Sequence, residues 1–201
     1  MNILIDKLST ILKKRVGDID FNTDFRIGML FEMLMQDRNI EKEIKVIQAI
    51  KLYYPHPEQI TDIEKAYDDI VWFYTCGKSD FNKNKKDEEE KSTKRKEKSP
   101  KDERIYDYEY DDGYIYSAFL QQYGIDLQDI EYLHWWKFKS MFDALNKDTK
   151  IVEIMEYRAI DLGKIKDKDE KDRYKKLKKI YSLPDMRTEA QKEADFGSSF
   201  W

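Results

Sequence analysis

Apolar residues recur every three or four positions along most of the chain, which is the spacing of an α-helix and not of a strand. Between position 23 and the prolines at 55 and 57, this spacing predicts two helices, with Thr23 or Asp24 as the N-cap of the first. Their predicted buried faces consist of Ile27, Leu30, Phe31 and Leu34 in the first helix and Ile40, Ile44 and Ile47 in the second.

The clearest helical pattern follows the two prolines and ends near Gly77, a residue type that commonly stops helices. Its predicted buried face consists of Ile60, Ile63, Tyr67, Ile70, Val71 and Tyr74. The N-terminus mixes signals, because Leu8 and Leu12 have helical spacing while residues 16–21 resemble a short strand. We expect an irregular cap there.

Beyond position 104 the helical spacing returns. A short helix over 114–123 is closed by Gly124, and two later helices are centred on 151–160 and 174–181. Between them the pattern predicts one longer helix, whose apolar face consists of Leu127, Ile130, His134, Phe138, Met141, Phe142 and Leu145. Trp135 and Trp136 flank this face, so the helix is either clamped between two elements or turned toward a partner.

Residues 78–104 interrupt the periodicity. The stretch 82–104 holds 10 Lys and Arg against 7 Asp and Glu and no apolar residue, a composition that cannot offset the entropy of ordering. The sequence therefore predicts an all-α protein, a helical bundle of about six to seven helices in two lobes, 1–77 and 105–185. A charged disordered linker at 78–104 joins the lobes, and a flexible tail follows at 186–201.

Overall composition narrows the classes of partner. The chain has 37 basic and 41 acidic side chains and a net charge of −4, whereas nucleic acid and anionic membranes attract concentrated positive charge. No apolar run approaches the roughly 20 residues that cross a bilayer. The single cysteine, Cys76, fits a reducing cytoplasm. We expect no nucleic-acid partner and no membrane association.

The sequence lacks the short motifs that are typical of common enzyme classes. The sequence contains no glycine-rich phosphate loop and no HExxH motif, and His56 and His134 lie far apart in it. Four acids interleaved with tyrosines resemble a hard-cation site, but their spacing is not that of an EF-hand and instead favours the start of a helix. These acids are Asp107, Glu109, Asp111 and Asp112. We predict no catalytic residue, no metal and no cofactor, and keep a metal-dependent enzyme as the alternative.

Aromatic residues concentrate in one part of the chain. Residues 106–142 contain twelve of the 28 aromatic side chains, a density typical of a small core or of a protein-binding surface. Together with FNTDFR at 21–26, the blocks YDYEYDDGYIYSAFLQQYGIDL at 106–127 and LHWWKFKSMFDAL at 133–145 resemble the bacteriophage gp-fifteen family of phages and prophages of Gram-positive bacteria.

This resemblance implies a protein of the tail module, encoded close to the tape-measure protein, without an established catalytic activity. A tail assembly chaperone is the function it favours, acting in the host cell cytoplasm during phage assembly; a structural component of the mature tail is the alternative. The tape-measure protein is the expected partner, followed by the tail tube protein and by self-association. Exposed faces of Tyr132, Trp135, Trp136 and Phe138 are the hypothesised partner-binding anchors.

Overall fold

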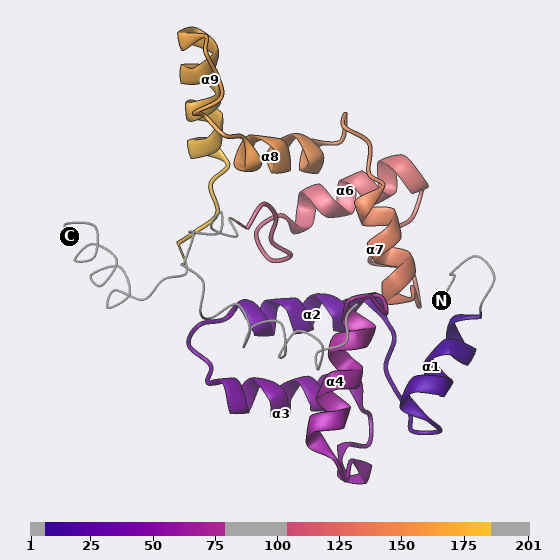
Figure 1. Ribbon diagram of the computed structural model, residues 1–201. Coiled ribbons are helices and arrows are strands. Elements are labelled where there is room, and N and C mark those ends of the chain that lie inside the picture. The colour runs from indigo at the N-terminus through magenta and orange to yellow at the C-terminus, as the bar shows by residue number, and fades with distance from the viewer. Residues whose placement is uncertain (1–6, 79–103, 186–201) are drawn as a thin grey trace, which may run out of the picture. The chain divides into compact units, whose positions relative to one another are not determined.

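The computed structural model describes residues 7–78 and 104–185 (Figure 1). Within these ranges the chain forms eight α-helices and one short 3-10 helix, with a single isolated β-bridge in place of any strand. The predicted all-α class is confirmed, with one helix more than the upper expected number. Almost all of the predicted linker, and the whole predicted tail, lie outside the described residues.

The described residues form two compact units. The first contains 7–78 and 132–140, and the second contains 104–131 and 141–185. The sequence places 105–185 in one lobe, whereas nine of these residues, Tyr132–Ser140, pack with the first unit. The dividing line falls within α7 (Trp135–Asp143).

The first unit begins with α1 (Leu8–Val16), where the sequence suggested an irregular cap. The helical spacing of its leucines is therefore the correct signal, and the predicted irregularity is wrong up to Val16. Gly17, with φ of 86°, follows the last helical residue and ends the helix. The helix packs against α4 (Ile63–Tyr74).

Helices α2 (Phe25–Gln36) and α3 (Lys42–Tyr53) pack against each other, and α3 also packs on α4 (Figure 1). The sequence offers Thr23 or Asp24 as the cap of α2, and Asp24 takes this role by accepting a hydrogen bond from the Arg26 amide at 2.9 Å. The buried faces match the prediction at Phe31 and otherwise differ: α2 buries Phe25, Gly28 and Phe31, while α3 buries Ala49, Ile50 and Tyr53.

The predicted core residues Leu30, Ile44 and Ile47 are instead exposed by 46%, 45% and 50%. Periodicity could not select the buried side, because both helices carry apolar residues around most of their circumference.

After the 3-10 turn Pro57–Gln59, Asp62 caps α4 through the Lys65 amide. The helix ends in a Schellman motif: the Gly77 amide donates to the Trp72 carbonyl at 2.8 Å, and the Cys76 amide donates to the Phe73 carbonyl at 3.0 Å. The predicted stop near Gly77 is correct, although Cys76, with φ of 55°, occupies the position that glycine usually takes. Ile63, predicted to be buried, is 56% exposed.

Residues 132–140 meet the segment that precedes α2. Amide and carbonyl groups pair twice, from Phe25 to Leu133 at 2.8 Å and from Trp135 to Thr23 at 2.9 Å, around the bridge between Asp24 and His134. The predicted long helix is wrong between 127 and 134, because residues 127–129 form a turn capped by Asp126 and residues 133–135 form this extended pairing. The helix begins only at Trp135.

The second unit contains α6 (Asp112–Tyr123), α8 (Lys150–Ala159) and α9 (Lys168–Ile180). Helix α6 packs on α8 and ends at Gly124, whose φ of 64° matches the predicted stop. Helix α9 packs on α8 and contains no buried residue. The main apolar core of this unit consists of Ile115, Ala118, Phe119, Leu127, Phe142, Leu145, Ile151 and Ile154.

Gly28 provides a first test of the packing. A Cβ added there would overlap the six-membered ring of Trp135, lying 2.8 Å from Cζ3 and closer still to two other ring carbons. Gly28→Ala should therefore lower the free energy of unfolding by about 1–3 kcal/mol or more, because the buried indole has no free space to move into.

Urea denaturation followed by circular dichroism measures this effect. Gly113→Ala is the matched control, since a Cβ at Gly113 meets nothing within 4 Å and alanine favours the helix. Equal stability of the Gly28→Ala variant and the wild type would contradict the described packing.

Candidate functional site

The structure places the four hypothesised anchors in different environments. Trp135, Trp136 and Phe138 are exposed by 0%, 2% and 0%, so the expectation that they present free faces is wrong. Tyr132 is exposed by 53%, and its hydroxyl lies 2.6 Å from the Thr23 hydroxyl. Of the four, only Tyr132 is open to a partner.

The two tryptophans are held by the C-terminal end of α4. The Trp135 indole N–H donates to the Tyr74 carbonyl at 2.8 Å, and the Trp136 indole N–H donates to the Phe73 carbonyl at 2.6 Å. The Tyr74 carbonyl lies at the helix end, where intrahelical donors are missing, and the Phe73 carbonyl accepts from Trp136 in addition to the Cys76 amide.

Stacking adds to these hydrogen bonds. Trp135 stacks on Tyr74 with a centroid distance of 5.3 Å, and Trp136 stacks on Phe73 at 5.6 Å. Phe138 extends the cluster by stacking on Phe25 at 5.1 Å. The adjacent tryptophans therefore cap the C-terminal end of α4 and pack against its aromatic side chains within the first unit.

His134 precedes α7 and acts as its cap. Its Nδ1 accepts a hydrogen bond from the Trp136 amide at 3.1 Å, and its ring contacts the edges of Phe73 and Trp136. Burial, together with the charge of Lys137, lowers the pKa of His134 to about 4. The imidazole is thus neutral at pH 7, as its acceptor role requires.

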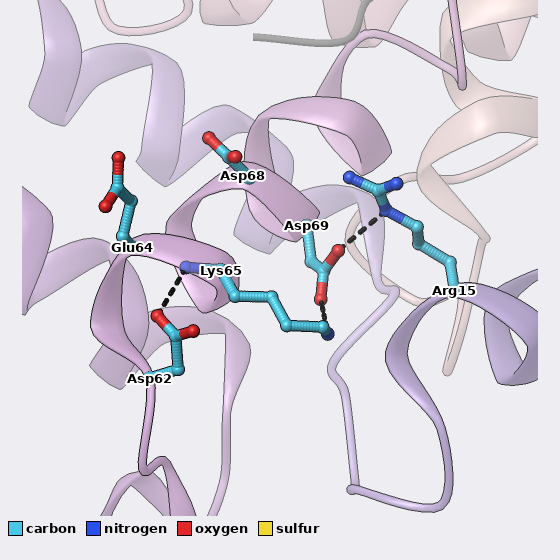
Figure 2. A pocket seen from close by; sticks show the side chains of 6 residues that line it. All are labelled: Arg15, Asp62, Glu64, Lys65, Asp68 and Asp69. Atoms are coloured by element: carbon cyan, nitrogen blue, oxygen red, sulfur yellow. Dashed lines mark hydrogen bonds and ion pairs between the residues drawn. The ribbon is translucent and has the colours of Figure 1, made fainter. Parts of the chain in front are cut away.

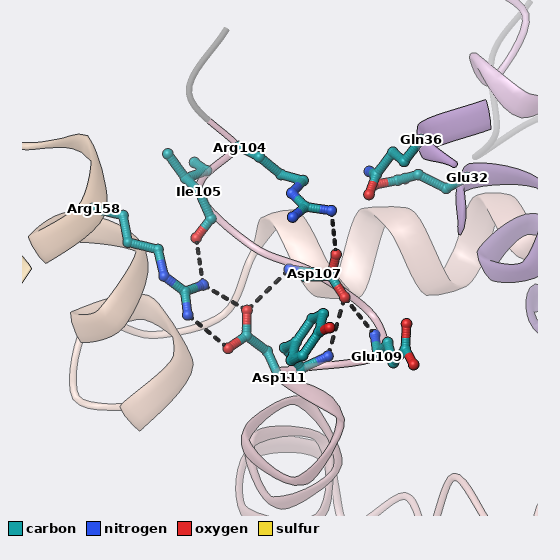
Figure 3. A network of polar contacts seen from close by, with 9 residues as sticks. Glu32, Gln36, Arg104, Ile105, Asp107, Glu109, Asp111 and Arg158 are labelled. Atoms are coloured by element: carbon teal, nitrogen blue, oxygen red, sulfur yellow. Dashed lines mark hydrogen bonds and ion pairs between the residues drawn. The ribbon is translucent and has the colours of Figure 1, made fainter. Parts of the chain in front are cut away.

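Two of the interleaved acids, Asp107 and Asp111, belong to a network of polar contacts in the second unit (Figure 3). Asp111 is 1% exposed and receives both terminal nitrogens of Arg158, at 2.6 and 2.9 Å. The same guanidinium donates to the carbonyls of Ile105 at 3.0 Å and Tyr181 at 2.6 Å. Arg158 therefore joins the start of α6, the segment before it and the end of α9.

Asp107 organises the turn before α6. Its carboxylate accepts from the amides of Glu109 and Tyr110 at 2.8 and 3.0 Å, and it pairs with Arg104 at 2.6 Å. Two of the four interleaved acids, Asp107 and Asp111, are thus occupied by protein donors. Among residues 7–78 and 104–185, no group of three His, Cys, Asp or Glu side chains could hold a metal ion.

A second acidic cluster lines an open cavity of about 500 Å³ between α1 and α4 (Figure 2). Buried Asp69 pairs with Arg15 and Lys65, at 2.7 Å each. Asp62, Glu64 and Asp68 complete the lining. Two cations, Arg15 of α1 and Lys65 of α4, balance the buried carboxylate of Asp69. The pair between Arg15 and Asp69 links α1 to α4.

Sequence reasoning missed Arg158, Arg15 and Gly28. Arg158 lies in the predicted helix at 151–160 and is separated by 47 residues from its partner Asp111, so no local spacing signals the pair. Asp69 did carry a signal, because an acid stands between Tyr67 and Ile70 in an otherwise apolar stretch. A buried acid requires a cation from elsewhere in the fold.

Removing the guanidinium of Arg158 tests the network. Arg158→Met should lower the free energy of unfolding by about 3–5 kcal/mol, because it leaves the carboxylate of Asp111 buried without its partner. Asp111→Asn in the same chain should restore part of this loss. Arg173→Met, at an exposed position of α9, is the control and should change stability by less than about 0.5 kcal/mol. Denaturant titration of the four proteins would contradict the network if the Arg158 and Arg173 variants behaved alike.

The pKa of His134 predicts a pH dependence of stability. The unfolded imidazole binds a proton below about pH 6.5, whereas the folded one resists protonation down to about pH 4. Stability should therefore fall as the pH falls through this window, by on the order of 2 kcal/mol from this residue. His134→Asn keeps an acceptor for the Trp136 amide and does not titrate. Urea midpoints at pH 7 and pH 4.5 should differ less in this variant than in the wild type, and an equal difference would contradict the assignment.

The two motif segments, FNTDFR and LHWWKF, pair with each other in the first unit. No described helix is long and apolar enough to cross a membrane. A search of curated proteins and a search of solved structures each found no match. The family model described as Bacteriophage Gp15 protein matches residues 4–183, which is most of the chain. The chain therefore belongs to the bacteriophage Gp15 protein family.

Proposed function

We propose that this protein is a tail assembly chaperone that binds helices of the phage tape-measure protein. The observation that carries the proposal is the exposure of apolar side chains on α2 and α3. Leu30, Ile44 and Ile47 occupy positions where periodicity alone predicts a core, yet about half of each side chain is exposed.

These residues lie on the outer sides of their helices. At 100° per residue, Leu30 is nearly opposite the buried Gly28, and Ile47 is nearly opposite the buried Ala49. An amphipathic helix is a suitable partner for such surfaces, because apolar residues at i, i+3 and i+4 spacing can cover them. The resemblance to tail-module proteins supports the tape-measure protein as the source of that helix.

The buried state of the tryptophans changes the proposed binding surface. Truncating Trp135 or Trp136 would remove caps from α4 and disturb the fold, so these variants cannot test binding. The proposed anchors are therefore Leu30, Ile44 and Ile47, with Tyr132 as the remaining exposed aromatic anchor of the original hypothesis.

Capture of the tape-measure protein tests the proposal. The two proteins of the same phage would be co-expressed, with an affinity tag on this chain, and the retained tape-measure protein quantified. Leu30→Glu with Ile47→Glu should reduce capture at least about tenfold, because two buried charges would replace apolar contacts.

The control is Ile63→Glu with Leu120→Glu, which changes two apolar residues of similar exposure, 56% and 44%, at other places. Both double variants should keep the thermal unfolding profile of the wild type. Failure of the wild type to retain the tape-measure protein would overturn the proposal. Equal loss in both variants would overturn the assigned surface.

Mass spectrometry of purified virions separates the chaperone from the alternative, a structural component of the mature tail. A chaperone leaves during assembly, so the protein should be detected in infected-cell lysates and be depleted from virions. Stoichiometric amounts in virions would favour the structural component.

A further inference from the structure

Helix α9 carries an unusual concentration of positive charge. Residues 168–180 contain seven cations and three acids, and all three acids precede Arg173, in a chain whose net charge is −4. The helix rests on α8 through its tyrosine side, where Tyr157 and Tyr174 have a centroid distance of 6.3 Å. Lys175, Lys176 and Lys179 are exposed, and within the described part of the chain none of them forms an ion pair. These three lysines are the basic face.

The same unit carries a surface of opposite charge at the start of α6. Asp107 and Asp111 are buried and paired, but the Glu109 and Asp112 side chains between and after them are exposed. Figure 3 shows the Glu109 carboxylate pointing away from the guanidinium groups of Arg104 and Arg158. Tyr110 and Tyr114 are exposed by 48% and 39%. Glu109, Tyr110, Asp112 and Tyr114 are the acid–tyrosine surface.

An ammonium group has two favourable partners on such a surface, a carboxylate and an aromatic ring face. The second unit already uses this combination internally. The Lys150 ammonium lies 2.9 Å from the Glu153 carboxylate and 5.1 Å from the centroid of the Tyr181 ring. The contact of one lysine ammonium with both a carboxylate and a tyrosine ring, which would join the basic face to the acid–tyrosine surface, therefore already occurs within this unit.

Arg158 fixes the two surfaces within one unit. Its guanidinium holds the Tyr181 carbonyl, directly after α9, and the Asp111 carboxylate, directly before α6. A surface and its complement, both rigidly carried by the same unit, suit a two-fold dimer, because each contact then occurs twice.

We propose that two copies of this chain associate through their second units, the basic face of each copy binding the acid–tyrosine surface of the other. This inference goes beyond the proposed function and does not depend on the tape-measure protein. Both charged surfaces lie in residues other than Leu30, Ile44 and Ile47, so capture and self-association can fail independently.

Sedimentation equilibrium of the full chain measures the association. A dimer should form at about 50 mM salt and dissociate to monomer at about 500 mM, because exposed ion pairs are screened. Lys175→Glu with Lys176→Glu should weaken the dimer at least about tenfold, and Glu109→Lys with Asp112→Lys should do the same. Lys42→Glu with Lys51→Glu, two exposed lysines of α3, is the matched control and should leave it unchanged.

Mixing the two charge-reversed proteins gives the sharpest outcome. Each reversed protein has two surfaces of like charge, but together they present opposite charges at both contacts, so the mixture should form heterodimers. Lys175→Gln with Lys176→Gln provides a milder variant, should a reversal disturb folding as judged by circular dichroism. A wild type that stays monomeric at low salt, an equal effect of the α3 control, or a mixture that stays monomeric would each overturn the proposal.

Discussion

Two indole hydrogen bonds at the end of α4 are the interaction on which the first unit depends. Trp135 and Trp136 donate to the carbonyls of Tyr74 and Phe73, and the Phe73 carbonyl also accepts from the Cys76 amide. Both indoles are almost fully buried, so their N–H groups need these acceptors. Gly28 lets α2 approach the Trp135 ring, and the pairing of 23–25 with 133–135 positions the tryptophans.

In the second unit, buried acceptors receive their hydrogen bonds from a charged side chain, Arg158. Arg158 supplies donors to a buried carboxylate and to two backbone carbonyls from segments far apart in the chain. A buried ion pair contributes little net stability, but the loss of either partner leaves an uncompensated charge. The pair therefore specifies the arrangement of α6, α8 and the end of α9 more than it strengthens it. Asp111, one of the four acids that suggest a metal site, is used for this purpose.

Side chains that are used in these buried contacts cannot bind a partner, so a binding surface must consist of other residues. Half of the twelve aromatic residues of 106–142 are buried, and three of the exposed large side chains, Leu30, Ile44 and Ile47, are aliphatic residues of α2 and α3. The exposed aliphatic residues of α2 and α3 offer apolar area for the proposed contacts with another helix. The charged faces of the second unit add a separate, salt-sensitive mode of association.

The sequence by itself determined the helical class, the start of α2 at a cap of Thr23 or Asp24, the stops at Gly77 and Gly124, and the family resemblance. Each depends on residues close together in the chain, so local spacing is sufficient to predict it. Only the tertiary structure decided which face of α2 and α3 is buried, that Trp135 and Trp136 are core residues, and that Asp111 meets Arg158. A helix with apolar residues all round has no preferred inner side until a partner packs against it. The partner that packs on Gly28 is Trp135, more than 100 positions along the chain.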